Sequence, residues 1–265
     1  MFAFTKLMQA ISAAVASVND AYFNLVTLLL PGNGTNGAQN NTFLDSSSNA
    51  FSITRNGNPT QGTFTPFSQT GWSNYFNGTN DYLTNTSTAL ITQTVSTFTV
   101  EGWAYMTANP ASVSNITGFI ALDGVATSAT NYLSFGPDSS RVLQFRWYDG
   151  VGKTCTGSTT LSLNTWYHIA AVVTSNSIKL YVNGVAETLS GTTTLTNRSG
   201  TSSNFSIAYN NTGSATFAGY ISNIRVCTSA VYSGNFTPST TPLTTTSQSA
   251  TGCVFLTCQS NRFID

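Results

Sequence analysis

The carboxylates of the chain decide first whether it could cleave a glycosidic bond. Retaining glycosidases hold two carboxyl groups about 5–5.5 Å apart, and residues two apart on a strand share one face. In the strand predicted around Glu101, the positions two and four residues further on are Trp103 and Tyr105. Because a single carboxylate cannot serve as both nucleophile and acid, we expect no such mechanism.

The single histidine, His168, is the other residue that could take part in catalysis. A Ser-His-Asp triad would have to use it as the base. Strand alternation places His168 in mid-strand on the face that carries Trp166 and Ala170, where packing or hydrogen bonding is its expected role. We therefore predict that the protein is not an enzyme.

Two predicted strands carry groups that suit the binding of a sugar. Sugars present apolar C–H faces and hydroxyls, which aromatic rings and polar side chains can match. The candidate residues, three on each strand, are Glu101, Trp103, Tyr105, Gln144, Arg146 and Tyr148. On the second strand they alternate with Leu143, Phe145 and Trp147, which predicts a solvent-facing concave face opposite an apolar one. Ordinary alternation with half-buried Tyr and Trp is the alternative interpretation.

The charge composition restricts the partners that the chain could bind. Of its 265 residues only 7% are charged, and nine basic residues balance nine acidic ones. No long-range field would attract nucleic acid or an anionic membrane, so we expect neither as a partner. A weakly charged surface near zero net charge tends to associate, which favours a protein built into an assembly.

The four cysteines, Cys155, Cys227, Cys253 and Cys258, fit no zinc-binding spacing. One alternative is a Cys253–Cys258 disulfide in an oxidising compartment. Free and partly buried thiols are the interpretation we favour, because unpaired Cys is commonly buried.

The N-terminal segment predicts the only helix, over residues 2–18. Its apolar stripe consists of Leu7, Ile11, Val15 and Val18, with Ala14 as an alternative to Val15. A lone amphipathic helix must bury this stripe. It could pack on the flank of the domain, or it could form a bundle with other copies or dock on a larger assembly. We place the helix at residues 1–20, assign it to oligomerisation or docking, and expect a homo-oligomer, with a trimer favoured.

The rest of the chain, residues 21–265, predicts a single all-β domain. Short strands recur at even spacing with no helix between them, which indicates an antiparallel jelly-roll sandwich. Asn183-Gly184 favours a tight hairpin turn because both residues tolerate positive φ. Residues 237–252 are of low complexity, and we expect them to extend over the surface.

The hairpin sequence Asn164–Val173 and Ile178–Gly184 resembles the centre of the laminin-G-like branch of the concanavalin-A-like jelly rolls. The resemblance covers about residues 22–258. Its other points are Tyr75–Gly78 with Asp81 and Tyr82, Phe98–Trp103, Trp166–Ile169, Leu180–Gly184 and Phe217–Arg225. It implies a fold that most often binds glycans and sometimes cleaves them.

Calcium is the cofactor that the same resemblance suggests. Many relatives bind it through Asp and backbone oxygens in loops at the rim of the sandwich. The matching carboxylates are Asp123 and Asp149, each followed by Gly, with Asn131 and Asp138 nearby. Asp-Gly is also ordinary turn chemistry, so we assign no metal site and no other cofactor.

Four phrases are similar to lectin-like structural proteins of marine tailed phages, especially those that infect cyanobacteria. They are Thr27–Leu30, Gly34–Asp45, Val231–Pro238 and Leu256–Asp265. The resemblance implies a location on the extracellular virion, as a tail-fibre, head-fibre or capsid-decoration protein with other virion proteins as partners.

Three hypotheses about function follow from these resemblances. The first is a virion jelly roll that attaches to polysaccharide on the host surface. The second is a cement or decoration protein without glycan binding, and the third is a secreted carbohydrate-binding protein or glycan-active enzyme.

Overall fold

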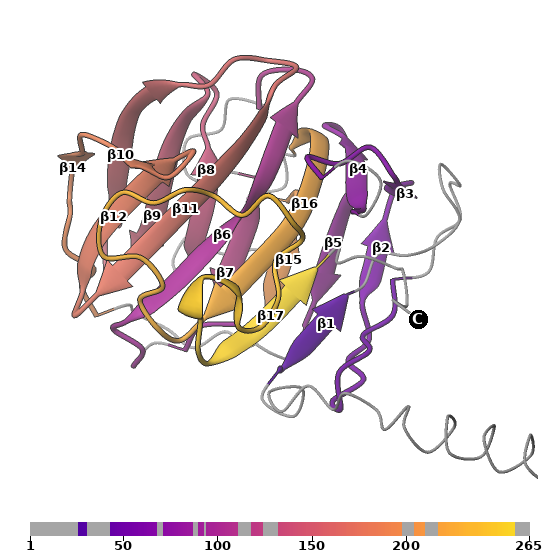
Figure 1. Ribbon diagram of the computed structural model, residues 1–265, viewed down its shortest axis with the longest axis horizontal. Helices are drawn as coiled ribbons and strands as arrows, with labels where there is room; N and C mark the ends of the chain where they lie inside the picture. Colours follow the sequence, from indigo (N-terminus) through magenta and orange to yellow (C-terminus); the bar gives the residue numbers. More distant parts are fainter. Residues whose placement is uncertain are drawn as a thin grey trace, which may run out of the picture.

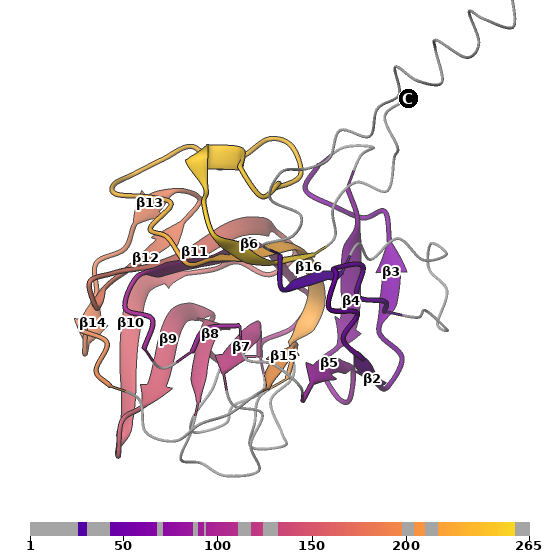
Figure 2. The ribbon, with the colours of Figure 1, turned by 90° about the horizontal axis from the view of Figure 1, so that it is seen from below.

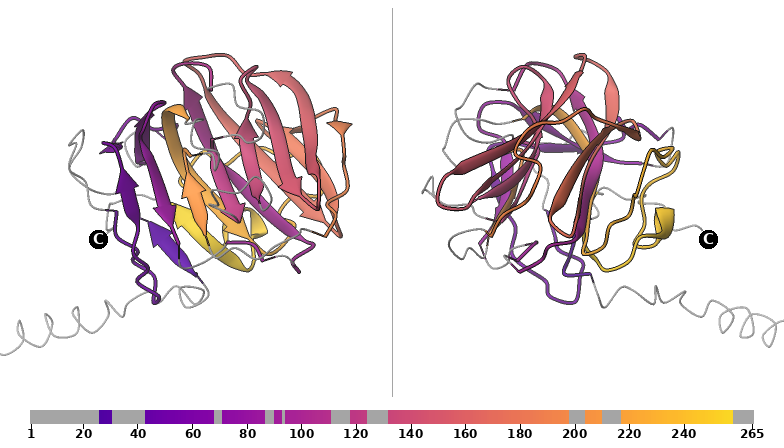
Figure 3. Two further views of the ribbon diagram at one scale, coloured as in Figure 1. Left: turned by 180° about the vertical axis from the view of Figure 1, so that it is seen from behind. Right: turned by 90° about the vertical axis from the view of Figure 1, so that its left-hand side faces the viewer.

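The computed structural model shows two β-sheets packed face to face (Figures 1 and 3). It describes residues 26–30, 43–67, 71–86, 90–92, 94–110, 118–123, 132–197, 204–209 and 217–257. The predicted helix and its stripe Leu7, Ile11, Val15 and Val18 lie outside these residues, as does Cys258. Among the described residues, no helix has the length and hydrophobicity needed to span a membrane.

Sheet I, as we name the first layer, has nine strands among the described residues. Seven follow the order β1, β17, β16, β6, β11, β12, β13, while β4 pairs with β16 and β3 with β4. Their bounds are Leu28–Leu30 (β1), Cys253–Thr257 (β17), Ala218–Cys227 (β16), Phe98–Met106 (β6), Trp166–Thr174 (β11), Ser177–Val182 (β12), Val185–Ala186 (β13), Ser73–Asn77 (β4) and Thr60–Gly62 (β3).

Sheet II, the second layer, has eight strands among the described residues, in the order β14, β10, β9, β8, β7, β15, β5, β2. Their bounds are Ser190–Gly191 (β14), Gly152–Thr160 (β10), Val142–Tyr148 (β9), Leu133–Pro137 (β8), Ile120–Asp123 (β7), Phe205–Ile207 (β15), Tyr82–Asn85 (β5) and Thr54–Asn56 (β2). Described pairings are antiparallel except the parallel pair β1–β17, so the sandwich is all-β as predicted but not purely antiparallel.

The core between the sheets follows the predicted alternation. Leu143, Phe145 and Trp147 of β9 are fully buried there, and Phe98 of β6 contacts Phe145 across the layers with ring centroids 6.1 Å apart. The nine-residue strand β10 was not predicted, because few of its residues are apolar. Only Cys155 of β10 is buried, so its sequence shows no apolar period.

The hairpin β11–β12 forms as the sequence predicts. Ser175 and Asn176 have φ of 46° and 69°, and Asn183 and Gly184 have φ of 47° and 78°, so each turn uses two residues at positive φ. The side chain of Asn183 also accepts a hydrogen bond from the backbone N–H of His168 (2.9 Å). This bond ties the second turn to β11.

Residues 228–252, which we call the strap, connect β16 to β17 and include the short 3₁₀ helix η2 (Ser247–Ser249). Figure 2 shows the strap lying over the outer face of sheet I, on the side away from sheet II. Part of this segment was predicted to extend over the surface, and it does. It also buries side chains, among them Tyr232 and Leu243.

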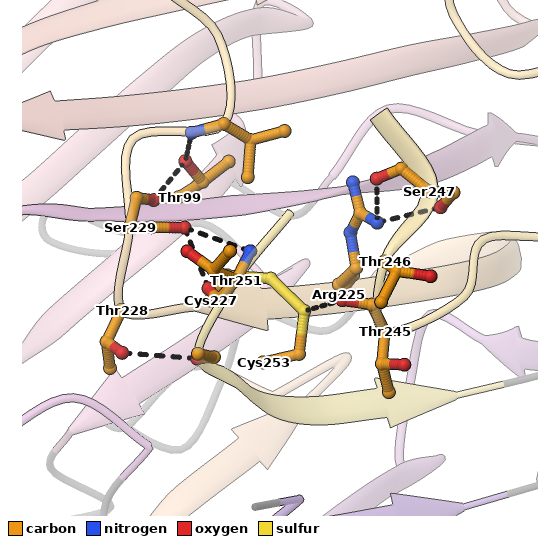
Figure 4. Close-up of a disulfide and its surroundings, with 12 residues drawn as sticks. Thr99, Arg225, Cys227, Thr228, Ser229, Thr245, Thr246, Ser247, Thr251 and Cys253 are labelled. Atoms are coloured by element: carbon orange, nitrogen blue, oxygen red, sulfur yellow. Dashed lines mark hydrogen bonds between the residues drawn. A yellow bond between two sulfur atoms is a disulfide. The ribbon is translucent and has the colours of Figure 1, made fainter. Parts of the chain in front are cut away.

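A disulfide joins Cys227 at the end of β16 to Cys253 at the start of β17 (Figure 4). The two residues are paired directly across neighbouring strands. The alternative pairing Cys253–Cys258 and the interpretation of Cys227 and Cys253 as free thiols are therefore wrong. Cys155 is a buried free thiol, and burial raises its pKa to about 11.

Candidate functional site

The carboxylate of Glu101, the first glycan candidate on β6, lies at the centre of a buried cluster. Its Oε2 lies 3.0 Å from Nε2 of His168 and accepts a hydrogen bond from the Tyr232 hydroxyl (2.7 Å). Its Oε1 accepts two hydrogen bonds from Arg225, from Nε (2.8 Å) and Nη2 (2.5 Å). Three strands and the strap thus supply this cluster.

Burial acts to raise the pKa of Glu101, but its neighbours outweigh that effect. The hydrogen bond with His168 and the positive charge of Arg225 lower the pKa of Glu101 to about 2. Glu101, His168 and Arg225 are all 0% exposed. Our prediction that Glu101 faces solvent is therefore wrong, because the strap closes over it.

This cluster holds the strap onto the sheet. From the Arg225 guanidinium, Nη1 donates to the carbonyl oxygens of Thr244 (2.8 Å) and Ser247 (2.7 Å). His168 packs as predicted, and within the described part of the chain its Nδ1 has no hydrogen-bond partner. With its oxygens engaged and its side chain buried, Glu101 has no access to a substrate in this structure.

The other two candidates on β6, Trp103 and Tyr105, do lie on the outer face of sheet I and are partly exposed. Phe67 covers Trp103 edge-on, with ring centroids 5.4 Å apart. Tyr105 contacts Trp166 of β11 and Tyr220 of β16, at 5.4 and 5.9 Å between ring centroids. Trp103 and Tyr105 therefore pack with other aromatic rings rather than with the carboxylate of Glu101.

The three candidates on β9 form a continuous polar group on the outer face of sheet II. Gln144, Arg146 and Tyr148 are each partly exposed, while the residues between them are buried. Gln144 Nε2 donates to Oδ2 of Asp138 (2.9 Å), and Arg146 Nη1 donates to Oε1 of Gln144 (3.4 Å). Asp138 also accepts hydrogen bonds from the backbone N–H groups of Ser140 and Val142 at the β8–β9 turn. These bonds fix the Asp138 end of the hydrogen-bonded group.

Tyr132 and Ser134, next to Arg146, were missed by the sequence analysis. The ring of Tyr132 lies 6.0 Å from that of Tyr148, and Ser134 stands directly across from Arg146 on β8. The Ser134 hydroxyl has no hydrogen-bond partner in the described ranges of the chain. Burial lowers the pKa of Arg146, against the opposing effects of Tyr132 and Asp138. The sequence predicts the alternation of side chains along β8, but it does not predict which residues of β8 pair with which residues of β9.

The two sets of candidates do not form one site. β6 lies in sheet I and β9 in sheet II, and each set points away from the shared core. Figure 2 shows these outer faces on opposite sides of the sandwich. The structure thus divides one predicted sugar-binding surface into two unrelated faces.

The two calcium candidates, Asp123 and Asp149, lie in different surroundings. Asp123 ends β7, opposite Leu133 of β8. Asp149 Oδ2 accepts from the Thr196 hydroxyl, which itself accepts from Nε1 of Trp147 (2.9 Å). The bond from Thr196 lowers the pKa of Asp149. Among the described residues, no three His, Cys, Asp or Glu side chains gather as metal ligands would. Asp123 and Asp149 stay untested candidates to which we assign no metal.

The sequence match to a family comes from the same region as these strands. Residues 76–233 match the family model Laminin_G_3, described as the concanavalin A-like lectin/glucanases superfamily. This match covers more than half of the chain. The chain belongs to the concanavalin A-like lectin/glucanases superfamily. No curated protein matches it.

Several solved structures are similar to this chain at low sequence identity. Domain 4 of the arabinanase AbnA of Geobacillus stearothermophilus, in complex with arabinotriose, is 19% identical with a TM-score of 0.47, over 74% of this chain and 89% of that one. Domains LG4-5 of the mouse laminin alpha1 chain are 13% identical (TM-score 0.44; 64% and 47% covered). The Ruminococcus gnavus sialidase CBM40, bound to sialyllactose, is 10% identical (TM-score 0.43; 52% and 79%). The superfamily assignment rests on the sequence match, not on these likenesses.

Proposed function

We propose that the chain is a non-catalytic glycan-recognition module, and that it binds sugar on the outer face of sheet II. The proposal rests on one observation. The planar polar side chains of Asp138, Gln144 and Arg146 are hydrogen-bonded in a row. This row lies beside the rings of Tyr132 and Tyr148. A binding site of this kind needs an apolar surface with a few fixed polar groups. The lectin-type fold is consistent with it.

Each group has a distinct part in the proposed binding. The partly exposed ring of Tyr148 offers an apolar surface for the C–H face of a sugar. The guanidinium of Arg146 and the amide of Gln144 offer donors to hydroxyl oxygens. Because Gln144 is bonded to Asp138, its orientation is fixed before the ligand arrives, which reduces the entropy lost on binding.

Glycan-array binding by purified protein tests the proposal, followed by titration of the best ligand. We expect Arg146→Ala to weaken binding roughly tenfold or more, because a hydrogen bond to a charged group contributes about 1.5–3 kcal/mol. Tyr148→Ala should weaken binding in the same direction by removing the ring. Each variant should keep the melting temperature of the unmodified protein.

Lys179→Ala is the matched control. It also removes one positive charge, but at an exposed position of β12 in sheet I, so it should leave affinity unchanged. The proposal is wrong if no glycan on the array binds the folded protein. It is also wrong if Arg146→Ala and Lys179→Ala bind equally well.

We further propose that this module is displayed on a phage particle, as an oligomer held by the N-terminal segment. Support comes from the phrases similar to phage structural proteins and from a chain in which only 7% of the residues are charged. Deleting residues 1–19 should abolish both the oligomer, for which we favour a trimer, and incorporation into particles. A truncated protein that still oligomerises and joins particles would remove this role.

The alternative of a purely structural decoration protein makes a different prediction. Such a protein would assemble on particles normally, yet it would show no glycan binding above a denatured control. Array binding and particle incorporation, measured on one preparation, therefore separate the two functions.

A further inference from the structure

Four aromatic side chains form a continuous row across the outer face of sheet I. Strand pairing aligns Tyr75 of β4 with Tyr220 of β16, Tyr220 with Tyr105 of β6, and Tyr105 with Trp166 of β11. Neighbouring strands lie about 4.8 Å apart, so the row spans roughly 14 Å. Ordinary strand alternation accounts for each residue but not for their alignment.

Phe64 sits on this row from the loop that follows β3. Its ring centroid lies 4.7 Å from that of Tyr220, 4.9 Å from Tyr105 and 5.5 Å from Trp166. The side chain is 45% exposed. It is thus one surface ring that makes three aromatic contacts without entering the core.

Two indole donors on the same face lack acceptors. Nε1 of Trp166, at one end of the row, and Nε1 of Trp103 on β6 are both buried, and neither has a hydrogen-bond partner among the residues that the structure describes. Buried donors are satisfied in most proteins, and an exception calls for an explanation. A ligand that supplies oxygen acceptors at this face would satisfy them.

The electrostatics of the face specify the ligand. The ionisable groups Glu101 and Arg225 of this sheet are bonded to each other beneath the strap, and Lys179 donates to the carbonyl of Ser233 (2.9 Å). Among the described residues, the row and the neighbouring Trp103 offer rings, tyrosine hydroxyls and indole N–H groups. Such a surface matches a ligand with apolar faces and uncharged hydroxyls, which describes a neutral sugar better than a charged one or a purely apolar peptide.

We propose that this aromatic row is a second glycan-binding site, specific for neutral oligosaccharides, which Phe64 occupies when no ligand is bound. A sugar that displaces Phe64 takes over its contacts with Tyr105 and Trp166 and brings hydroxyl acceptors to the indoles. The site lies on the face of the sandwich opposite to Arg146. It is therefore independent of the site on sheet II.

Calorimetric titration with cellohexaose, laminarihexaose and mannohexaose tests this site, with an oligomannuronate as the acidic comparison. We expect at least one neutral hexasaccharide to bind, with a change in tryptophan fluorescence. Trp166→Phe keeps a ring but removes the N–H, and it should weaken binding about threefold to tenfold, as the loss of one hydrogen bond does. Phe64→Ala should instead tighten binding, because the ligand no longer competes with that ring.

Arg146→Ala separates this proposal from the one above. Neutral-sugar binding that survives Arg146→Ala and is weakened by Trp166→Phe supports a second site. Binding that Arg146→Ala abolishes, no neutral binding at all, or weaker binding by Phe64→Ala would each overturn it. So would concentration-dependent dimerisation that Tyr105→Ala abolishes, since the row would then be a protein interface. Unchanged melting temperatures confirm that each variant is folded.

Discussion

At the scale of single residues, Glu101 shows how burial changes the role of a functional group. Its position beside Trp103 on β6 suits sugar binding, yet its oxygens contact His168, Tyr232 and Arg225. In a low-dielectric interior a carboxylate is tolerated only when it is paired and hydrogen-bonded. Glu101 therefore stabilises the attachment of the strap.

We predict that Glu101→Gln destabilises the protein by about 3–5 kcal/mol, because it leaves Arg225 buried without its counter-charge. Urea unfolding at neutral pH measures this loss. Glu187→Gln is the matched control. Glu187 accepts bonds from the backbone of Ser158 and Thr159 near the surface, so its replacement should have a much smaller effect.

The pKa of Glu101 predicts how stability depends on pH. The folded value of about 2 lies below the ordinary value of 4.5, so the folded state binds this proton less readily than the unfolded state. The stabilisation is complete above pH 4.5 and is lost as the pH falls towards 2. Unfolding measured across this interval should show a steeper loss in the unmodified protein than in Glu101→Gln.

At the scale of elements, the strap is held at its base, along its length and at its tip. The Cys227–Cys253 disulfide closes the base, Arg225 binds its carbonyl oxygens, and Phe236 N–H donates to the carbonyl of Gly184 (2.9 Å). Phe236 also stacks on Tyr232, with ring centroids 3.4 Å apart. A segment of low complexity is ordered here by its partners rather than by its own composition.

We predict that the double variant Cys227→Ser/Cys253→Ser loses about 2–4 kcal/mol of stability, as expected for a loop of this size. Chemical unfolding with and without dithiothreitol measures it. The reductant should destabilise the unmodified protein and leave the double variant unaffected. Equal stability of the oxidised protein and the double variant would contradict the role of the disulfide.

Gly184→Ala should loosen the tip of the strap. A Cβ at Gly184 would lie 1.9 Å from the carbonyl oxygen of Phe236, at φ of +78°. Gly150→Ala is the matched control, since Gly150 has φ of +109° but nothing within 4 Å of a Cβ. Proteolysis within residues 233–241 should accelerate in Gly184→Ala only, while both variants carry the strain of positive φ.

At the scale of the whole molecule, the two proposed sites lie on opposite outer faces of one sandwich. A module with two opposed sites can bridge two polysaccharide chains even as a monomer. We predict that the protein cross-links polysaccharide-coated beads that display both ligands, as measured by light scattering. In the protein without residues 1–19, which we expect to be a monomer, Arg146→Ala or Trp166→Ala alone should abolish cross-linking while leaving binding through the other face.

Local patterns were sufficient to predict much of the fold. Strands β6 and β9 form around Glu101 and Gln144, where the sequence predicts strands, and the Asn183-Gly184 turn is where two residues of positive φ are expected. Alternation and turn chemistry depend on neighbours in the sequence, so they can be read there. The superfamily follows from the same local phrases.

Tertiary structure alone decided what lies beside each candidate residue. Glu101 and Arg225 are 124 residues apart, and nothing in their local sequence indicates that the strap covers both. Cys253 was closer in sequence to Cys258 than to Cys227, yet the pairing of β17 with β16 selected Cys227. Alternation predicts that a side chain leaves the core, but which sheet it leaves, and what covers it there, depends on strand order and on contacts between distant segments.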